Sequence, residues 1–96
     1  MLTKELRKRV PPLGATENDS DPIAVCRLYT PGSHWSWYVT EYDHETREAF
    51  GLVHGEYEEL GLFNLDELES LRGPAGQMIQ LDPNWKPRRI SEVKWS

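Results

Sequence analysis

The middle of the sequence alternates between runs of β-branched or aromatic residues and short runs of turn-forming residues. The longer runs span residues 23–30, 35–42 and 49–55, and two shorter runs span 60–63 and 77–81. Such runs favour strands, and connections as short as 31–34 and 43–48 are typical of hairpins. The pattern predicts a meander of three to five antiparallel strands.

A first helix is predicted at the N-terminus. Leu2, Leu6 and Val10 recur at a spacing of four, which places them on one side of a helix. Thr3 is a suitable N-cap, and Pro11 ends the helix because it cannot donate a backbone hydrogen bond. We expect a short helix that docks onto the rest of the chain.

A second helix is predicted at about 65 to 72, within the sequence FNLDELESLRGP. Asn64 can cap it and Glu67 can close a capping box, while Phe63 can pack against Leu68. At the other end, Gly73 is expected to adopt the left-handed conformation that commonly ends helices.

The register of the meander follows if residue 42 pairs with residue 49. The predicted opposite pairs are Trp37 with His54, Val39 with Leu52, and Glu41 with Phe50. The core face would then carry Trp35, Trp37, Val39, Phe50, Leu52 and His54, together with Ala24, Cys26 and Leu28. A slip of one residue would exchange the two faces, because side chains alternate along a strand.

The opposite face would be amphipathic. It would carry Val25, Arg27, Tyr29, Ser36, Tyr38, Thr40, Tyr42, Gly51 and Val53. Tyrosines beside an arginine can stack on bases or form a protein interface. The other interpretation is that loops and the C-terminal segment cover this face.

The charges are unevenly distributed along a chain of 96 residues with a net charge of -5. Residues 10–71 hold 13 acidic and two basic side chains, whereas the segments on either side are each net basic. An acidic body repels nucleic acid, because DNA binding depends on neutralising phosphates. It either keeps the protein in solution or docks onto a basic partner. The candidate partner-binding residues are Glu41, Glu45, Glu56 and Glu58, with Tyr29, Tyr38 and Tyr42.

The C-terminal segment combines basic and aromatic side chains. Its members are Trp85, Lys86, Arg88, Arg89, Lys94 and Trp95. They could hold a phosphate backbone while a tryptophan stacks on a base, or the tryptophans could pack into the fold.

No convincing catalytic set is present in the sequence. His54 and Glu56 suggest a small hydrolase only weakly, and the three histidines lie in separate segments without metal-ligand spacing. Cys26 lies in an apolar run, which indicates a buried thiol. We therefore expect no catalytic residues, no metal and no cofactor.

The expected location is a reducing, cytoplasmic one. Cys26 has no second cysteine with which to form a disulfide in this chain. The N-terminal segment is charged where a signal peptide needs an apolar stretch. The longest apolar run, residues 23–26, is far shorter than a membrane span.

Four phrases resemble, in order, a family of short bacterial and phage proteins, domain-of-unknown-function family 2958. The phrases are MLTKELRKRVPPLGATE, TPGSHWSWYVTEYD, FGLVHGEYEELGLFNLDELESLRGP and ISEV. The resemblance implies a protein carried by plasmids, integrative elements or phages, near genes for DNA processing or antirestriction. It supplies no catalytic residues.

These observations predict one α+β domain, a small antiparallel sheet of three to five strands with two short helices packed on it. Its expected parts are a docking helix (1–10), an exposed loop (14–22), a core (23–81) and a basic tail (82–96). The expected function is a small non-enzymatic binding protein of a mobile element. It would engage, and inhibit, a host protein that acts on nucleic acid, such as one of host defence. The alternative is a nucleic-acid-binding accessory factor that uses the tail.

Overall fold

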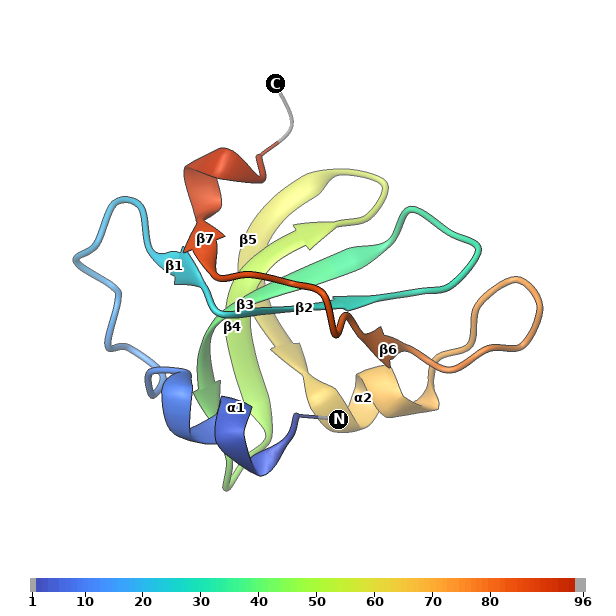
Figure 1. Cartoon of the computed structure of the whole chain (residues 1–96), viewed down its shortest axis with the longest axis horizontal. Coiled ribbons are helices and arrows are strands. Elements are labelled where there is room, and N and C mark those ends of the chain that lie inside the picture. Colours follow the sequence, from blue (N-terminus) through green and yellow to red (C-terminus); the bar gives the residue numbers. More distant parts are fainter. Residues whose placement is uncertain (1, 95–96) are drawn as a thin grey trace.

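The computed structural model describes residues 2–94 and contains an antiparallel sheet with helices at one of its faces (Figure 1). The sheet has five strands in the order β5-β4-β3-β2-β6. Their bounds are β2 (Cys26–Tyr29), β3 (Ser36–Asp43), β4 (Glu48–His54), β5 (Glu58–Asn64) and β6 (Gln80–Leu81). The predicted antiparallel sheet with two short helices is therefore present: β2 to β5 follow one another as a meander, and β6 adds to the sheet beside β2.

A second, smaller sheet is not predicted by the sequence. It pairs β1 (Ile23–Ala24) with β7 (Arg88–Arg89), and a short 3-10 helix, η1 (Ile90–Glu92), follows directly. The expected first strand over residues 23–30 is thus split at Val25 into two strands that belong to different sheets. The C-terminal segment runs across the main sheet to reach β1 (Figure 1).

A β-bulge in β3 changes the register that the sequence predicts. Thr40 has no partner in β4, and its hydroxyl donates a hydrogen bond to the carbonyl of Phe50 at 3.0 Å. The predicted pairing of Glu41 with Phe50 is confirmed. Beyond the bulge the predicted pairs are wrong by one residue: Trp37 lies opposite Val53 and not His54, and Val39 lies opposite Gly51 and not Leu52.

The bulge also moves side chains between the two faces of the sheet. On the face that the helices cover, the buried cluster includes Cys26, Leu28, Trp37, Val39, Tyr42 and Ala49. On the other face, Tyr38 and Leu52 pack with Ala24 and Ile90, and the tail covers them with Trp85 and Val93. The predictions that Ala24, Phe50, Leu52 and His54 share the face of Trp37 are therefore wrong. The predictions that Tyr42, Val25 and Val53 lie on the opposite face are wrong as well.

The two helices pack on the sheet as expected. α1 (Lys4–Arg9) is capped by the Thr3 hydroxyl, and its Leu6 packs in the core together with Leu2 and Val10, which lie just before and after the helix. α2 (Leu65–Ser70) is capped by Asn64, whose side-chain oxygen accepts from the backbone N–H groups of Asp66 and Glu67. Within residues 2–94, no helix is long and apolar enough to cross a membrane.

The C-terminal end of α2 differs from the expectation in two ways. The helix ends at Ser70, and Leu71 is already extended. Gly73 does not have positive φ. Instead, a Cβ atom at Gly73 would lie 2.8 Å from the carbonyl oxygen of Pro31, so this glycine permits a close approach to the turn after β2.

Candidate functional site

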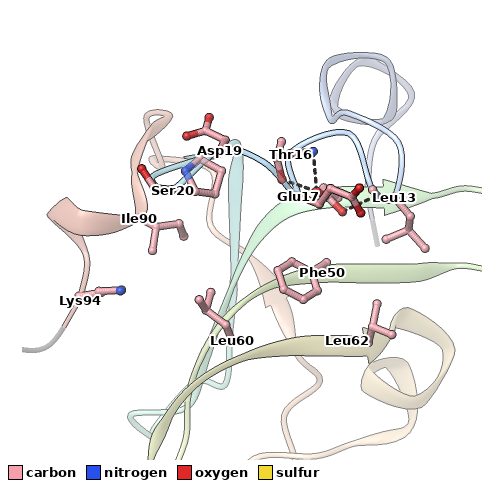
Figure 2. A pocket seen from close by; sticks show the side chains of 13 residues that line it. Leu13, Thr16, Glu17, Asp19, Ser20, Phe50, Leu60, Leu62, Ile90 and Lys94 are labelled. Carbon is pink, nitrogen blue, oxygen red and sulfur yellow. Dashed lines mark hydrogen bonds between the residues drawn. The ribbon is translucent and has the colours of Figure 1, made fainter.

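An apolar groove lies on the tail-covered face of the sheet, between β5, the loop over residues 13–22 and η1 (Figure 2). Its volume is about 630 Å³. Phe50, Leu60 and Leu62 form its floor, and Ile90 closes one end. The charged side chains that line it belong to its walls: Glu17 and Asp19 come from the loop, Glu41 from β3 and Lys94 from the tail.

One wall of the groove is held by Glu41, which the β3 bulge directs toward the loop. Its carboxylate accepts from the backbone N–H groups of Gly14 at 2.7 Å and Thr16 at 2.8 Å, and also from the Thr16 hydroxyl. Burial alone would raise the pKa of Glu41, but these hydrogen bonds outweigh it and the pKa is lowered. Glu41 is only 4% exposed, so its role is to anchor the loop.

Asp21 connects this loop to η1. Its carboxylate accepts from the Ser91 hydroxyl at 2.7 Å and from the Ser91 backbone N–H at 2.8 Å. These two hydrogen bonds, from the side chain first and then the backbone, lower the pKa of Asp21. The backbone N–H of Ile90 also donates to the carbonyl of Pro22. The two walls of the groove are therefore tied to each other.

The groove is open beside β5, which is an edge strand. Among the described residues, β5 pairs with β4 on one side and with no strand on the other. Leu60 and Leu62 lie on its groove side and are 53% and 63% exposed. An exposed apolar strand with one unpaired edge is the geometry to which a further strand can add.

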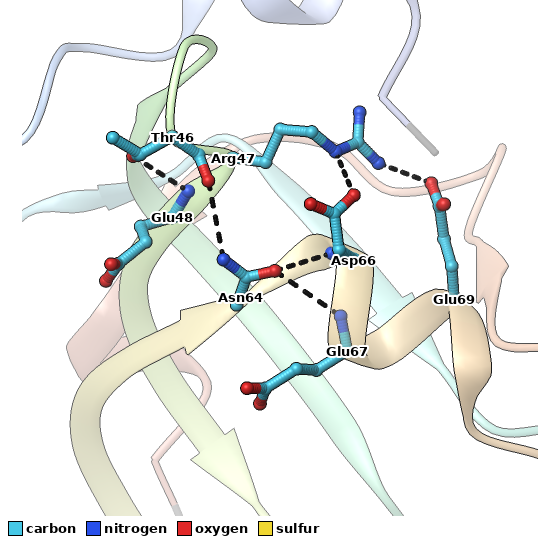
Figure 3. Close-up of polar contacts among 7 residues, drawn as sticks. All are labelled: Thr46, Arg47, Glu48, Asn64, Asp66, Glu67 and Glu69. Carbon is cyan, nitrogen blue, oxygen red and sulfur yellow. Dashed lines mark hydrogen bonds and ion pairs between the residues drawn. The ribbon is translucent and has the colours of Figure 1, made fainter.

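Acidic side chains lie toward both ends of β5, near the turn before it and in α2 after it. Residues 56–69 contain six of them and no lysine or arginine: Glu56, Glu58, Glu59, Asp66, Glu67 and Glu69. Arg47, from the turn between β3 and β4, offsets part of this charge through ion pairs of 2.5 Å to Asp66 and to Glu69 (Figure 3). This segment therefore remains net negative.

The structure does not bring the four candidate glutamates together. Glu45 lies in the turn between β3 and β4, and Glu56 lies in the turn between β4 and β5. The seven residues of β4 separate these turns by about 20 Å. Glu58 lies 2.8 Å from the Nε2 atom of His54, and Glu41 is buried as described above. Only Glu56 and Glu58 belong to the acidic edge.

The three candidate tyrosines are also dispersed. Tyr38 and Tyr42 are buried on opposite faces of the sheet, so the expectation that they are available for a partner is wrong. Tyr29 is half-buried, and the Arg27 guanidinium lies 5.0 Å from the centre of its ring. The tail covers the face on which Tyr38 lies.

The basic tail packs against the fold through Trp85. The Trp85 indole donates a hydrogen bond to the carbonyl of Ala24, packs 5.2 Å from the ring of Tyr38 and carries the Arg88 guanidinium above it at 4.4 Å. Arg89 donates to the carbonyl of Asp21. Lys86 and Lys94 are exposed, and Trp95 lies outside the described residues. Trp85 is therefore engaged in the fold rather than free to stack on a base.

Helix α1 carries a denser group of cationic side chains than the tail does. Lys4, Arg7 and Lys8 of α1 line a hollow together with His44. The periodicity of α1 indicates this outward-facing basic side, but not its proximity to His44.

His54 is not arranged as an accessible catalytic group. It is buried on edge against the Tyr38 ring, and its carboxylate neighbour is Glu58 rather than the predicted Glu56. Ser36 lies opposite His54 in the register, but its hydroxyl accepts from Arg27 and it is buried too. Neither lines the groove.

Cys26 is buried, and its burial raises the pKa of the thiol to about 12. Among residues 2–94, no three histidine, cysteine or acidic side chains form a possible metal site.

The sequence interpretation missed Leu60 and Leu62 as site residues. The signal was present, because two leucines separated by Gly61 in the fourth strand of a meander must share one face. Their prominence depends on β5 being an edge strand, which follows only from the strand order.

Comparison with known proteins gives one match. A family model described as "Protein of unknown function (DUF2958)" matches residues 1–93, which includes the docked tail as far as Val93. No curated protein and no solved structure matches the chain.

Proposed function

The chain belongs to the DUF2958 family of proteins of unknown function, and we propose that it is a small non-enzymatic protein-binding module. It holds an extended segment of a partner along β5, with the partner's apolar side chains in the groove. The observation that carries the proposal is the exposure of Leu60 and Leu62 on an edge strand beside a groove of about 630 Å³. Peptides commonly bind by adding a strand to such an edge.

The partner we propose is basic. The six acidic residues of 56–69 flank the two leucines, so a basic segment would gain attraction on both sides of its apolar contacts. A second copy of this chain is a poorer occupant. Antiparallel self-pairing centred on Gly61 would bring Asp66 of one copy toward Glu56 of the other, and like charges repel.

We further propose that the module belongs to a mobile genetic element and inhibits a host protein that acts on nucleic acid. Proteins that bind nucleic acid present basic surfaces, and such a surface would be attracted to the acidic side chains near β5. The setting implied by the family resemblance supports the same partner class.

The test is an affinity pull-down of the tagged chain from a bacterial lysate, divided into nuclease-treated and untreated halves. The wild type is compared with the double variant Leu60→Ser/Leu62→Ser. The expected result is a captured protein that survives nuclease and is lost with the double variant.

The matched control is Leu71→Ser/Met78→Ser, which removes two apolar side chains of similar exposure, 45% and 50%, away from the groove. This control should capture the same protein as the wild type. Equal capture by all three chains would contradict the proposed groove. Capture only of nucleic acid, or of material that disappears with nuclease, would favour the accessory-factor alternative.

A further inference from the structure

A second, smaller pocket lies next to β5 on the opposite face of the sheet. It has a volume of about 260 Å³, below the roughly 300–1,000 Å³ that is usual for a small-molecule ligand. Its lining is Trp35, Val53, Gly55, Glu56, Tyr57 and Glu59. We call it the aromatic pocket. Its size suits one side chain rather than a whole ligand.

The tryptophan wall of this pocket is held in place by its neighbours. The Trp35 ring lies against the backbone of Gly55, where a Cβ atom would overlap its ring carbons. Trp37 packs against it with ring centres 5.9 Å apart, and the Nε2 atom of His34 lies 3.0 Å from the Gly55 carbonyl oxygen. Trp35 nevertheless remains 37% exposed. The pocket is therefore formed before any ligand binds.

The chemistry of the lining matches an organic cation. Trp35 and Tyr57 line the pocket, and aromatic rings of these types attract ammonium and guanidinium groups; Tyr57 is 72% exposed. The carboxylates of Glu56 and Glu59 add negative charge at the same place. No lysine or arginine of residues 2–94 lines this pocket, so its charge is not neutralised from within.

The position of the pocket relates it to the edge of β5. Glu59 lies opposite Val53, on the helix-covered face, whereas Leu60 lies opposite Leu52 on the groove face. Side chains alternate along any strand that adds to this edge. A segment with apolar side chains in the groove therefore presents its intervening side chains on the face of the aromatic pocket.

We propose that the aromatic pocket binds a lysine or arginine side chain of the partner segment that adds to β5. This inference rests on the proposed function, since the cation comes from the same segment. It assigns the partner an alternating pattern, with apolar residues on one side and a cationic residue between them.

The test uses two synthetic peptides, acetyl-Thr-Leu-Lys-Leu-Thr-amide and the same peptide with glutamine in place of lysine. Each is titrated into the ¹⁵N-labelled chain, and NMR shifts are followed at the Trp35 indole N–H and at the backbone amides of β5. The lysine peptide should bind about tenfold more tightly than the glutamine peptide. When the chain is saturated with the lysine peptide, the Trp35 indole signal should shift.

Two variants test the pocket itself. Glu56→Gln/Glu59→Gln changes only exposed side chains, so it should fold normally and abolish the preference for lysine. Gly55→Ala should displace the Trp35 ring and have the same effect. Equal binding of both peptides to wild type, with shifts in β5, would overturn the cation pocket alone. No binding of either peptide at β5 would overturn the proposed function as well.

Discussion

Gly51 and Gly61 lie directly opposite each other in the β4–β5 pair, but only Gly51 is enclosed by other atoms. A Cβ atom at Gly51 would overlap the carbonyl group of Tyr38, whereas one at Gly61 would meet nothing within 4 Å. The close approach at Gly51 accompanies the β3 bulge that starts beyond Val39. This glycine therefore permits the register that places Phe50 in the groove.

The two glycines provide a matched pair of variants. Gly51→Ala should cost about 3 kcal/mol or more, because β3 and β4 must separate to admit the methyl group. Gly61→Ala should be about 0.5–1 kcal/mol more stable than wild type, since glycine is unfavourable within a strand. Urea unfolding at 25 °C measures both. Equal stabilities of the two variants would contradict the register described here.

Glu41 should make the stability of the loop wall depend on pH. Its pKa is lowered in the folded chain, so the unfolded chain binds more protons in acid. Its contribution is therefore complete above the ordinary glutamate pKa of about 4.3 and is lost as the pH falls through the lowered value. Glu41→Gln should cost about 1–2 kcal/mol at pH 7.

The measurement for Glu41 is the difference in unfolding free energy between wild type and Glu41→Gln from pH 7 to pH 3. The pKa values of Asp21 and Asp43 are also lowered, but both chains retain these groups and their effects cancel in the difference. A difference that grows as the pH falls would contradict the assigned role.

Arg47 combines a strained backbone with two ion pairs. Its φ is 62°, which costs a non-glycine residue about 1–2 kcal/mol. Arg47→Gly and Arg47→Ala both lose the ion pairs to Asp66 and Glu69, but only alanine retains the strain. The glycine variant should therefore be about 1 kcal/mol more stable than the alanine variant in thermal unfolding. The reverse order would indicate that the turn adopts another conformation.

Trp85 should contribute mainly to stability rather than to nucleic-acid binding. Trp85→Ala should cost roughly 2–4 kcal/mol, because it removes the packing on Tyr38. Trp85→Phe keeps a ring but loses the hydrogen bond to Ala24, for a cost of about 1 kcal/mol. Chemical unfolding measures both values. Wild-type stability of Trp85→Ala would mean that the tail is not docked in solution.

Local signals in the sequence predict much of the fold. Thr3 and Asn64 cap the two helices as expected, because capping depends on neighbours within three residues. The strands around residues 36–43 and 48–54 follow from residue type and short turns. The placement of Cys26 and Leu28 on the face of Trp37 and Val39 follows from the same alternation and is confirmed.

Longer-range features are not predicted by the same signals. A single extra residue at Thr40 exchanges the faces of Phe50, Leu52 and His54, and no local preference marks it. Gly51 within a strand is the one available hint, since such glycines often accompany bulges. The groove itself joins residues 13–22, β5 and η1, which are distant in sequence.

Site-specific photocrosslinking from position 62 tests whether a protein partner binds along β5. A photoreactive phenylalanine analogue replaces Leu62 in one chain and Met78 in a control chain, both exposed in the wild type. Each tagged chain is irradiated in a nuclease-treated bacterial lysate. A discrete protein adduct is expected from position 62, through a basic segment of the partner, and none from position 78. The same adducts from both positions, or none from position 62, would contradict binding of a protein partner along β5.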